Sequence, residues 1–447
     1  MALFRKLFFK YVQSVIRSYH GKWYAIGRDT VPDKDSLVIF VGNHRCCMMD
    51  PLDMVMTLED RILRCFVRSD VFNVPKPVAS ALTWLGLIPL ARSGYEKGGL
   101  VEFRQKNIEN FDRAIDSMER GDSVLIYPEG QHQILKRLAV FNNGYVWMAF
   151  RAAERNGFSR EVNIVPFAHF YGNYFHPFHQ YLTCFCEPFK LSAYYDRYKE
   201  KPRTTVAEVN DEIRDRVQEA MFHIDDEEHY TGLDQLICGP YGRKYAESCG
   251  LDPKHLPDRF ASDKKLIRDI ESAKSKFPDE MSALLDRLQR LETDLLSRNI
   301  RDWVVASRPG AANLIIRILL LTVLSPLALA SVITLPAKLV PGYIHRKTAR
   351  LPEDILFRTT WQVGTLILLT IPVFWILVSL LLLAFAPVAA GAWFVAYPTL
   401  LLFSVWYRRF LKKTKGVYNY VTSDDRKALS AEREDIVNKL NEILKMI

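Results

Sequence analysis

The sequence predicts an α/β domain with helices packed on a central sheet, followed by a charged helical region and by C-terminal membrane helices. Strand-like and helix-like runs alternate between residues 23 and 188, which is typical of helices packed on a sheet. Residues 263–301 are strongly charged, and residues 363–405 form a run of 43 positions without a charged side chain. A bilayer crossing needs about 20 apolar residues, so this run is long enough for a membrane.

Residues 1–22 combine basic and apolar side chains in a helical pattern. The basic residues are Arg5, Lys6, Lys10, Arg17 and Lys22, and the apolar ones are Phe4, Phe8, Val12, Val15 and Ile16. The pattern predicts an amphipathic helix that lies on an anionic membrane surface. The alternative is an ordinary amphipathic helix that packs on the following domain, and the two interpretations can both hold in part.

Residues 23–250 form the predicted α/β domain. The expected strands cover residues 37–41, 63–67, 123–127, 162–170 and 181–186, and the expected helices cover residues 107–119, 144–155 and 205–224. In such domains the loops at the strand ends gather the reactive side chains.

Residues 255–308 are predicted to form a charged helical hairpin. Met281, Leu284, Leu288, Leu291 and Leu295 are spaced by three, four, three and four positions, which indicates one apolar seam along a helix. Pro278 is expected at the start of the second helix, where proline is tolerated.

Two membrane segments follow, at residues 311–340 and 363–406. Basic clusters lie between them and after the second, and lysine and arginine stay on the cytoplasmic side. The second segment is therefore expected to cross twice, with a turn at residues 387–391. Pro326 favours a re-entrant hairpin in the first, with a full crossing as the alternative. An amphipathic helix within residues 424–447 ends the chain, and the α/β domain is expected on the cytoplasmic face of the membrane.

Composition narrows the possible partners. The chain carries a net charge of +9, but no basic-aromatic motif of a nucleic-acid reader is visible, so no nucleic acid is expected. The seven cysteines include no C-x-x-C pair, and we expect reduced thiols used as small apolar residues. His44, Asp50, His132 and His169 are the candidate ligands of a metal hydrolase, but their spacing matches no metal motif, so no metal is expected.

The phrase FVGNHRCCMMDPLDM, residues 40–54, carries the strongest chemical signal. A strand ends at Gly42, and His44 and Asp50 follow six positions apart. Such an offset does not place two side chains on one helical face, so they meet only if the backbone turns between them. An aspartate bonded to one imidazole nitrogen fixes the tautomer and leaves the other nitrogen free to take a proton. The alternative is a histidine and an aspartate that are unrelated.

Three more phrases at strand ends complete a pattern: GLIPLAR at residues 86–92, LIYPEGQH at 125–132 and NIVPFAHFY at 163–171. With the His44–Asp50 block, their order resembles the glycerolipid acyltransferase superfamily of the lysophosphatidic acid and glycerol-3-phosphate acyltransferase type. The resemblance covers about residues 20–230 and is most similar to a Bacteroidetes-type bacterial branch. Three features depart from the family pattern: five residues separate His44 from Asp50, Tyr127 replaces phenylalanine, and Gln131 stands where serine or threonine is common.

The resemblance implies an acyltransferase fold with a mixed central sheet and a role for each matching residue. His44 would be the general base that activates an acceptor hydroxyl, and Asp50 would orient it. Arg92 would bind the acceptor's phosphate, because guanidinium matches phosphate in a forked geometry. Glu129 and Gly130 would shape the acceptor pocket, with Glu129 in contact with a hydroxyl or with Arg92.

The implied reaction moves a fatty acyl group from acyl-CoA or acyl carrier protein to a glycerolipid precursor, in phospholipid synthesis at a bacterial inner membrane, with no cofactor. Lysophosphatidic acid is the first acceptor expected, then glycerol 3-phosphate, then a lyso-aminolipid. A non-catalytic membrane scaffold with the same fold is the alternative from another class, because fold alone does not establish activity.

Overall fold

The computed structural model describes residues 2–91, 100–132, 135–172, 177–348 and 361–447. The chain divides into two compact units, of which the first comprises Met1–His223 and the second begins at Ile224. We expected the α/β domain to continue to residue 250. It ends earlier because helices α8 (Tyr230–Cys238) and α9 (Pro240–Ser248) pack on helices α11 and α10 of the second unit.

The first unit is built on a mixed sheet with the strand order β1-β7-β6-β2-β5-β3-β4, and β8 pairs with β6. The strands are β1 His20–Ile26, β2 Leu37–Gly42, β3 Leu63–Arg68, β4 Leu87–Leu90, β5 Ser123–Ile126, β6 Val162–Tyr171, β7 His179–Phe185 and β8 Phe189–Lys190. Strands β4, β3, β5, β2 and β6 run parallel, whereas β7 is antiparallel to β6. The carboxyl ends of five neighbouring strands therefore share one edge, and the predicted mixed α/β fold is confirmed.

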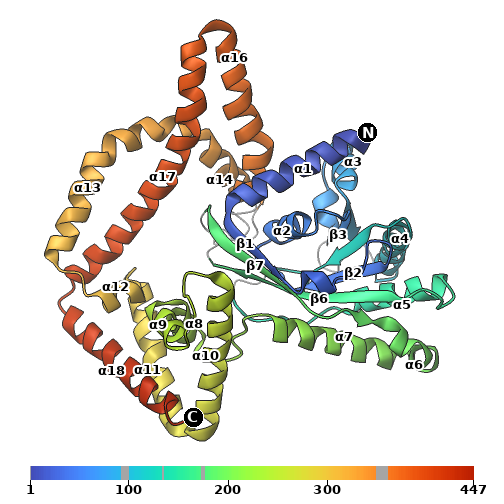
Figure 1. Ribbon diagram of the computed structural model, residues 1–447, viewed down its shortest axis with the longest axis horizontal. Helices are drawn as coiled ribbons and strands as arrows, with labels where there is room; N and C mark the ends of the chain where they lie inside the picture. Colours follow the sequence, from blue (N-terminus) through green and yellow to red (C-terminus); the bar gives the residue numbers. More distant parts are fainter. Residues whose placement is uncertain (1, 92–99, 133–134, 173–176, 349–360) are drawn as a thin grey trace. The chain divides into compact units, whose positions relative to one another are not determined.

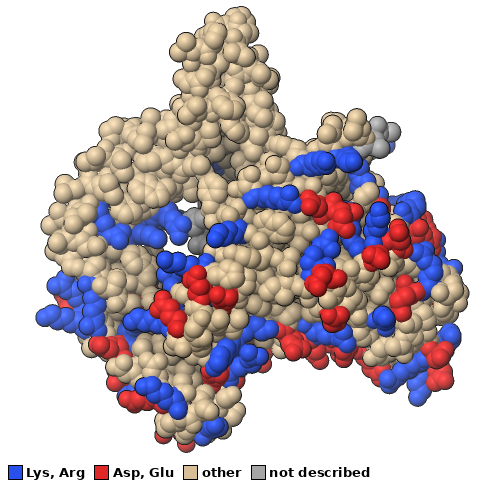
Figure 2. Space-filling model, in the orientation of Figure 1, with Lys and Arg blue, Asp and Glu red and all other residues tan. Residues whose placement is uncertain are grey.

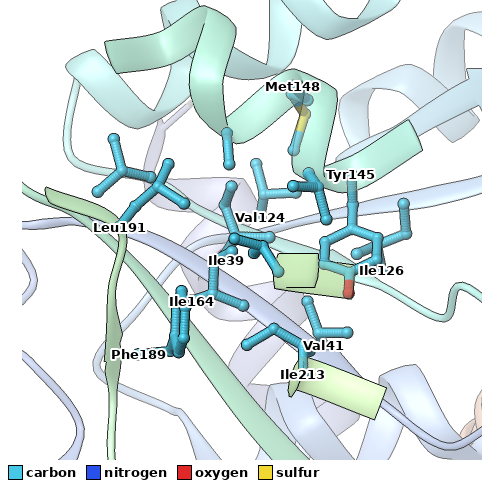
Figure 3. Packing of buried hydrophobic residues seen from close by; sticks show 14 of the residues in the cluster. Ile39, Val41, Val124, Ile126, Tyr145, Met148, Ile164, Phe189, Leu191 and Ile213 are labelled. Carbon is cyan, nitrogen blue, oxygen red and sulfur yellow. The ribbon is translucent and has the colours of Figure 1, made fainter. Parts of the chain in front are cut away.

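Helices cover both faces of this sheet (Figure 1). Apolar side chains of α4 (Leu100–Glu119), α5 (Gly144–Arg155) and α7 (Pro202–Ala220) pack on one face, in the core shown in part in Figure 3. Helix α2 (Met49–Thr57) packs on the other face and in turn contacts α1 (Ala2–Tyr19). Ile39 and Val41 of β2 contribute to the first core and Phe40 to the second, as the alternating directions of strand side chains require.

Helix α1 fits both interpretations of its sequence in different halves. Val12 and Ile16 are buried against the domain, which confirms packing for the second half. Leu3 and Phe4 in the first half keep 70% and 66% of their surface exposed. Contact of this first half with a membrane remains a prediction.

The second unit contains the charged helices, and the C-terminal helix packs against them. The helices outside its long apolar segments include α8, α9, α10 (Leu256–Lys276), α11 (Pro278–Ser297), α12 (Asp302–Ser307) and α18 (Arg426–Leu444). Pro278 begins α11, and all five residues of its predicted apolar seam are buried. Ion pairs join α18 and the residue before it to the helices that precede the apolar segments: Arg287 with Glu432 and Asp435, Arg298 with Asp425, Arg308 with Glu434, and Asp302 with Arg433.

Three helices of the second unit are long and apolar enough to cross a membrane: Ala311–Thr334, Trp361–Phe385 and Pro387–Val421. The last two form a hairpin that turns at Ala386, next to the predicted turn. Its arms are joined where the indole N–H groups of Trp375 and Trp393 each donate to a carbonyl of the opposite arm, both at 2.9 Å. Figure 2 shows no charged side chain on the visible surface of the projecting part of this hairpin, around the turn.

The turn that we expected at Pro326 is not formed. Pro326 lies inside α13 (Ala311–Ala330), and the helical run continues to Thr334 before α14 (Pro336–Thr348). Proline is tolerated within apolar helices because the surroundings compensate for the single backbone hydrogen bond that it removes. Part of the basic cluster predicted between the two apolar segments falls in residues 349–360, which lie outside the described residues.

Candidate active site

The loop after β2 begins with two residues that fix its path. A Cβ atom on Gly42 would lie 2.4 Å from the ring of Phe167, so only glycine fits at the end of this strand. The Asn43 side chain then accepts the backbone N–H of His169 at 2.7 Å and donates to the carbonyl of the same residue at 3.4 Å. The chain that leads to His44 is thereby attached to strand β6.

His44 and Asp50 meet in the structure. Nδ1 of His44 lies 2.7 Å from Oδ2 of Asp50. The chain between them turns at Cys47, whose φ of 44° is left-handed, and then enters α2 with Asp50 in its first turn. This turn is how an interval of five residues still brings the two side chains together.

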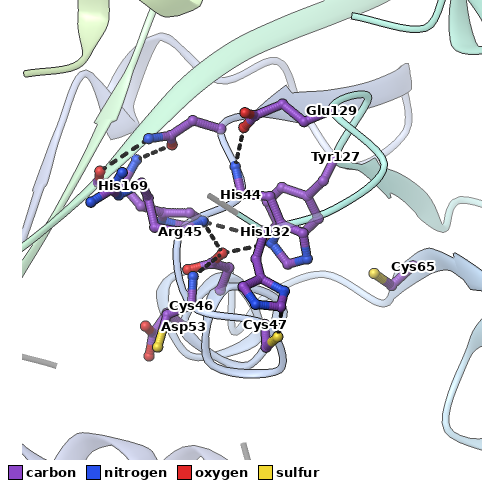
Figure 4. Close-up of polar contacts among 12 residues, drawn as sticks. His44, Arg45, Cys46, Cys47, Asp53, Cys65, Tyr127, Glu129, His132 and His169 are labelled. Carbon is purple, nitrogen blue, oxygen red and sulfur yellow. Dashed lines mark hydrogen bonds and ion pairs between the residues drawn. The ribbon is translucent and has the colours of Figure 1, made fainter. Parts of the chain in front are cut away.

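The same carboxylate oxygen organises the whole loop. Oδ2 of Asp50 also accepts the backbone N–H groups of Arg45 at 2.7 Å and Cys46 at 2.8 Å (Figure 4). Asp50 is fully buried, whereas 19% of the His44 side chain is exposed. Among the described residues, Nε2 of His44 has no hydrogen-bond partner. The accessible side of the imidazole is therefore the one that can exchange a proton.

Two residues that follow strand β5, Tyr127 and Glu129, contact His44. The ring of Tyr127 stacks on the imidazole at a centroid distance of 4.5 Å. Glu129 accepts the backbone N–H of His44 at 2.6 Å through one oxygen and that of Ala139 at 3.0 Å through the other. Glu129 thus holds the His44 loop to the turn that follows β5, and its expected contact with a hydroxyl or with Arg92 remains a prediction.

Burial and hydrogen bonding shift the pKa values of Asp50 and Glu129 in opposite directions. Burial raises the pKa of Asp50, but the hydrogen bond from His44, the charges of His169 and His44, and the bond from Tyr171 outweigh it and lower the pKa to about 2. Burial also raises the pKa of Glu129, and here the two backbone hydrogen bonds offset only part of the rise. Asp50 is therefore the firmly ionised group beside the imidazole.

Two predicted site residues remain, Gly130 and Arg92. Gly130 has a φ of 70° in the turn after β5. Arg92 lies outside the described residues, but the preceding residue, Ala91, is fixed by both side-chain atoms of Asn107, at 2.8 and 2.9 Å. Strand β4 thus ends at the same edge of the sheet as β2, the strand that precedes His44.

Sequence reasoning missed the polar groups that lie behind the His44–Asp50 pair. Tyr171, at the end of β6, contacts Asp50, and Asp53 and His20 continue inward from it. Asp53 follows Asp50 by three positions, the spacing of one helical turn, which was the available signal. His20 and Tyr171 come from distant strands and carry no local signal.

A thiol and an imidazole at the rim of the site were also missed. Sγ of Cys47 lies 2.9 Å from Nδ1 of His132, and the His132 ring is 6.2 Å from that of His44. The nitrogens of His169 instead face the hydroxyls of Tyr127 and Tyr181. Of the four candidate metal ligands, His44 and Asp50 thus contact each other, whereas His132 and His169 contact other residues.

The arrangement is suited to general-base chemistry. The ionised Asp50 accepts the Nδ1–H proton, which leaves Nε2 as the basic atom. When Nε2 takes a proton, the adjacent carboxylate stabilises the imidazolium, and the stacked Tyr127 keeps the ring in place.

The lowered pKa of Asp50 predicts a pH-dependent contribution to stability. A carboxyl with a lowered folded-state pKa stabilises the fold above its unfolded value of 3.8, and this stability is lost as the pH falls through about 2. Asp50→Asn should therefore lower the free energy of unfolding by about 2 kcal/mol or more near pH 6, and the difference from wild type should narrow near pH 2.5. Equilibrium urea unfolding followed by circular dichroism measures this, and a difference that stays constant with pH would contradict the assignment.

The comparisons with known proteins bear on the first unit. The structure of the 1-acyl-sn-glycerophosphate (LPA) acyltransferase PlsC from Thermotoga maritima is similar at 14% sequence identity and a TM-score of 0.33, over 48% of this chain and 80% of that chain. These values are too low to carry an argument about activity. The search of curated proteins finds no match. The family model described as Acyltransferase matches residues 24–169, the segment that contains His44, Asp50, Tyr127 and Glu129.

Proposed function

We propose that this chain is a membrane-bound O-acyltransferase that moves a fatty acyl group to the hydroxyl of a glycerolipid precursor. The observation that carries the proposal is the His44–Asp50 pair, with Nδ1 bonded at 2.7 Å and Nε2 without a partner among the described residues. The Acyltransferase family match over residues 24–169 supports it.

In the proposed reaction, Nε2 of His44 takes the proton of the acceptor hydroxyl as the oxygen attacks the thioester carbon of the donor. The C–S bond then breaks, and the proton passes from Nε2 to the departing thiolate of CoA or carrier protein. Asp50 stabilises the imidazolium that exists between these steps. Such a positioned base contributes about 10²–10⁴ in rate. No cofactor and no covalent acyl-enzyme is needed.

The acceptor proposed first is lysophosphatidic acid. Strand β4, which precedes Arg92 in the sequence, ends at the sheet edge that carries His44, with strands β3 and β5 between β4 and β2. At about 4.8 Å per strand, the two points are separated by about 14 Å across the sheet. The assignment of Arg92 to the acceptor's phosphate rests on the sequence pattern GLIPLAR, because Arg92 lies outside the described residues.

The catalytic prediction concerns His44. His44→Ala should lower the rate of acyl transfer by at least about 10²-fold, because the general base is lost. Asp50→Asn should leave a small residual activity, because the imidazole remains but is no longer oriented or stabilised. Product formation by purified protein, followed by mass spectrometry, measures both.

The matched control is His255→Ala, which removes an imidazole from the charged hairpin of the second unit and should leave the rate unchanged. Retention of more than about a tenth of the wild-type rate by His44→Ala would rule out the general-base role, since such a base is worth at least about 10².

The acceptor prediction concerns Arg92. Arg92→Ala should raise the Michaelis constant for a phosphate-bearing acceptor about tenfold or more, because a charge-assisted hydrogen bond contributes about 1.5–3 kcal/mol. The constant for the acyl donor should change little. Arg104→Ala, on the exposed side of α4, is the matched control. An unchanged acceptor constant for Arg92→Ala would instead favour an acceptor without a phosphate.

We also propose a membrane topology, which the ion pairs of the second unit support. Arg298 and Arg308 precede the first apolar helix, and their partners Asp425 and Glu434 follow the last one. Groups that pair in water lie on the same side of a membrane. The number of crossings between Arg308 and Asp425 is then even, although three helices are long enough to cross.

The hairpin of Trp361–Phe385 and Pro387–Val421 accounts for two crossings, so α13 would lie in the membrane without crossing it. The surroundings of α13 agree with this placement. Its Arg317 lies over the rings of Trp303 and Phe410, and the Tyr407 hydroxyl donates to the carbonyl of Leu321. Helix α13 thus lies beside the basic end of α17, where lysine and arginine favour the cytoplasmic side.

The topology prediction can be tested by labelling single cysteines in a cysteine-free chain. Tyr343→Cys and Met446→Cys, at exposed positions, should react with an impermeant thiol reagent only when the cytoplasmic face is accessible. Gly391→Cys should react only from the opposite face. Labelling of position 343 from the face opposite to the cytoplasm would show that α13 crosses the membrane.

A further inference from the structure

A buried chain of polar side chains continues inward from the catalytic pair. The Tyr171 hydroxyl lies 2.6 Å from Oδ1 of Asp50 and 2.7 Å from Oδ2 of Asp53. The other oxygen of Asp53 lies 2.6 Å from Nε2 of His20, whose Nδ1 lies 3.1 Å from Nε2 of His179. The side chains of Asp50, Asp53 and His20 have no exposed surface.

If both carboxyls are ionised, these polar side chains have one hydrogen too few to form all of their hydrogen bonds. Tyr171 has a single hydroxyl hydrogen, yet its oxygen is within hydrogen-bond distance of two carboxylates. Two oxygen atoms at 2.6–2.7 Å with no hydrogen between them repel each other. His20 offers no remedy, because its Nε2 faces the other oxygen of Asp53 in either tautomer. One more proton is therefore needed, on Asp50 or on Asp53.

The surroundings of the two carboxyls decide which one carries it. Asp50 has three donors on Oδ2, namely Nδ1 of His44 and the backbone N–H groups of Arg45 and Cys46, and it lies in the first turn of α2. Hydrogen bonds to the charged form and the helix N-terminus both favour the ionised state. Asp53 has one such donor, the ring N–H of His20. The extra proton thus belongs on Oδ2 of Asp53.

We propose that Asp53 is held as a neutral carboxylic acid that donates to Tyr171, while Tyr171 donates to the ionised Asp50. Asp53 and Tyr171 are then positioning residues, and the proposal rests on the proposed function of the His44–Asp50 pair. A second negative charge so close to Asp50 would be repelled, so one proton shared between the carboxyls leaves a single anion beside His44. Other titratable groups around this chain include Tyr19, Cys46, Cys65, Tyr127, His169, His179 and Tyr181.

The decisive experiment compares Asp53→Asn with Asp50→Asn. The amide introduced by Asp53→Asn can donate to Tyr171 and accept from His20, as the neutral acid does, so kcat and KM should stay within about threefold of wild type. Tyr171→Phe should lower kcat about tenfold or more and change KM little, because Asp50 loses its positioning donor. Asp53→Ala, which leaves the Tyr171 hydroxyl without its donor, should resemble Tyr171→Phe.

Infrared spectroscopy of the protein with isotope-labelled aspartate provides a readout that does not depend on activity. A carbonyl stretch of a protonated carboxylic acid should be present in wild type and absent in Asp53→Asn. Its absence from wild type, or an Asp53→Asn variant as inactive as Asp50→Asn, would overturn the proposal. If wild type transfers no acyl group to any acceptor, the proposed function fails, while the infrared band still tests the proton on Asp53.

Discussion

The candidate site depends on the carboxylate of Asp50 more than on any other group. Its Oδ2 atom accepts hydrogen bonds from the His44 side chain and from the backbone of Arg45 and Cys46. One ionised oxygen therefore fixes the imidazole, closes the loop and holds the start of α2. The favourable charge interactions overcome complete burial and bring the pKa of Asp50 to about 2. The proposed chemistry requires this pre-arranged anion, because it stabilises the imidazolium as soon as that cation forms.

The sheet brings the other residues of the site next to the His44–Asp50 pair. Because β2 and β5 run parallel and adjacent, His44 after one strand meets Tyr127 and Glu129 after the next. The backbone contact from Glu129 and the clamp of Asn43 on β6 hold the loop from both sides. The buried hydrogen bonds of Tyr171 with Asp50 and Asp53 hold the Asp50 carboxylate in place. Each of these contacts restrains His44 without occupying its Nε2 atom.

Much of this could be predicted from sequence where the signal is local. The helix at residues 144–155 and the seam of α11 follow from periodicity, and His44 with Asp50 follows from a strand that stops at Gly42. The path of the chain between them could not be predicted, because it depends on a left-handed residue, Cys47, that is not glycine. His20 and Tyr171 escaped notice because they reach Asp53 from strands that are far apart in the sequence. The boundary at residue 223 and the unbroken helix at Pro326 depend on tertiary packing, which overrides local composition.

The central claim is that the His44–Asp50 pair transfers an acyl group from a thioester to a lipid hydroxyl. The most direct measurement incubates the purified full-length protein in lipid vesicles with an acyl thioester and lysophosphatidic acid, and determines the mass of every lipid product. The account predicts a product heavier than lysophosphatidic acid by one acyl group, together with one equivalent of free thiol. Release of thiol with only free fatty acid, or no consumption of the thioester with any glycerolipid acceptor, would contradict it.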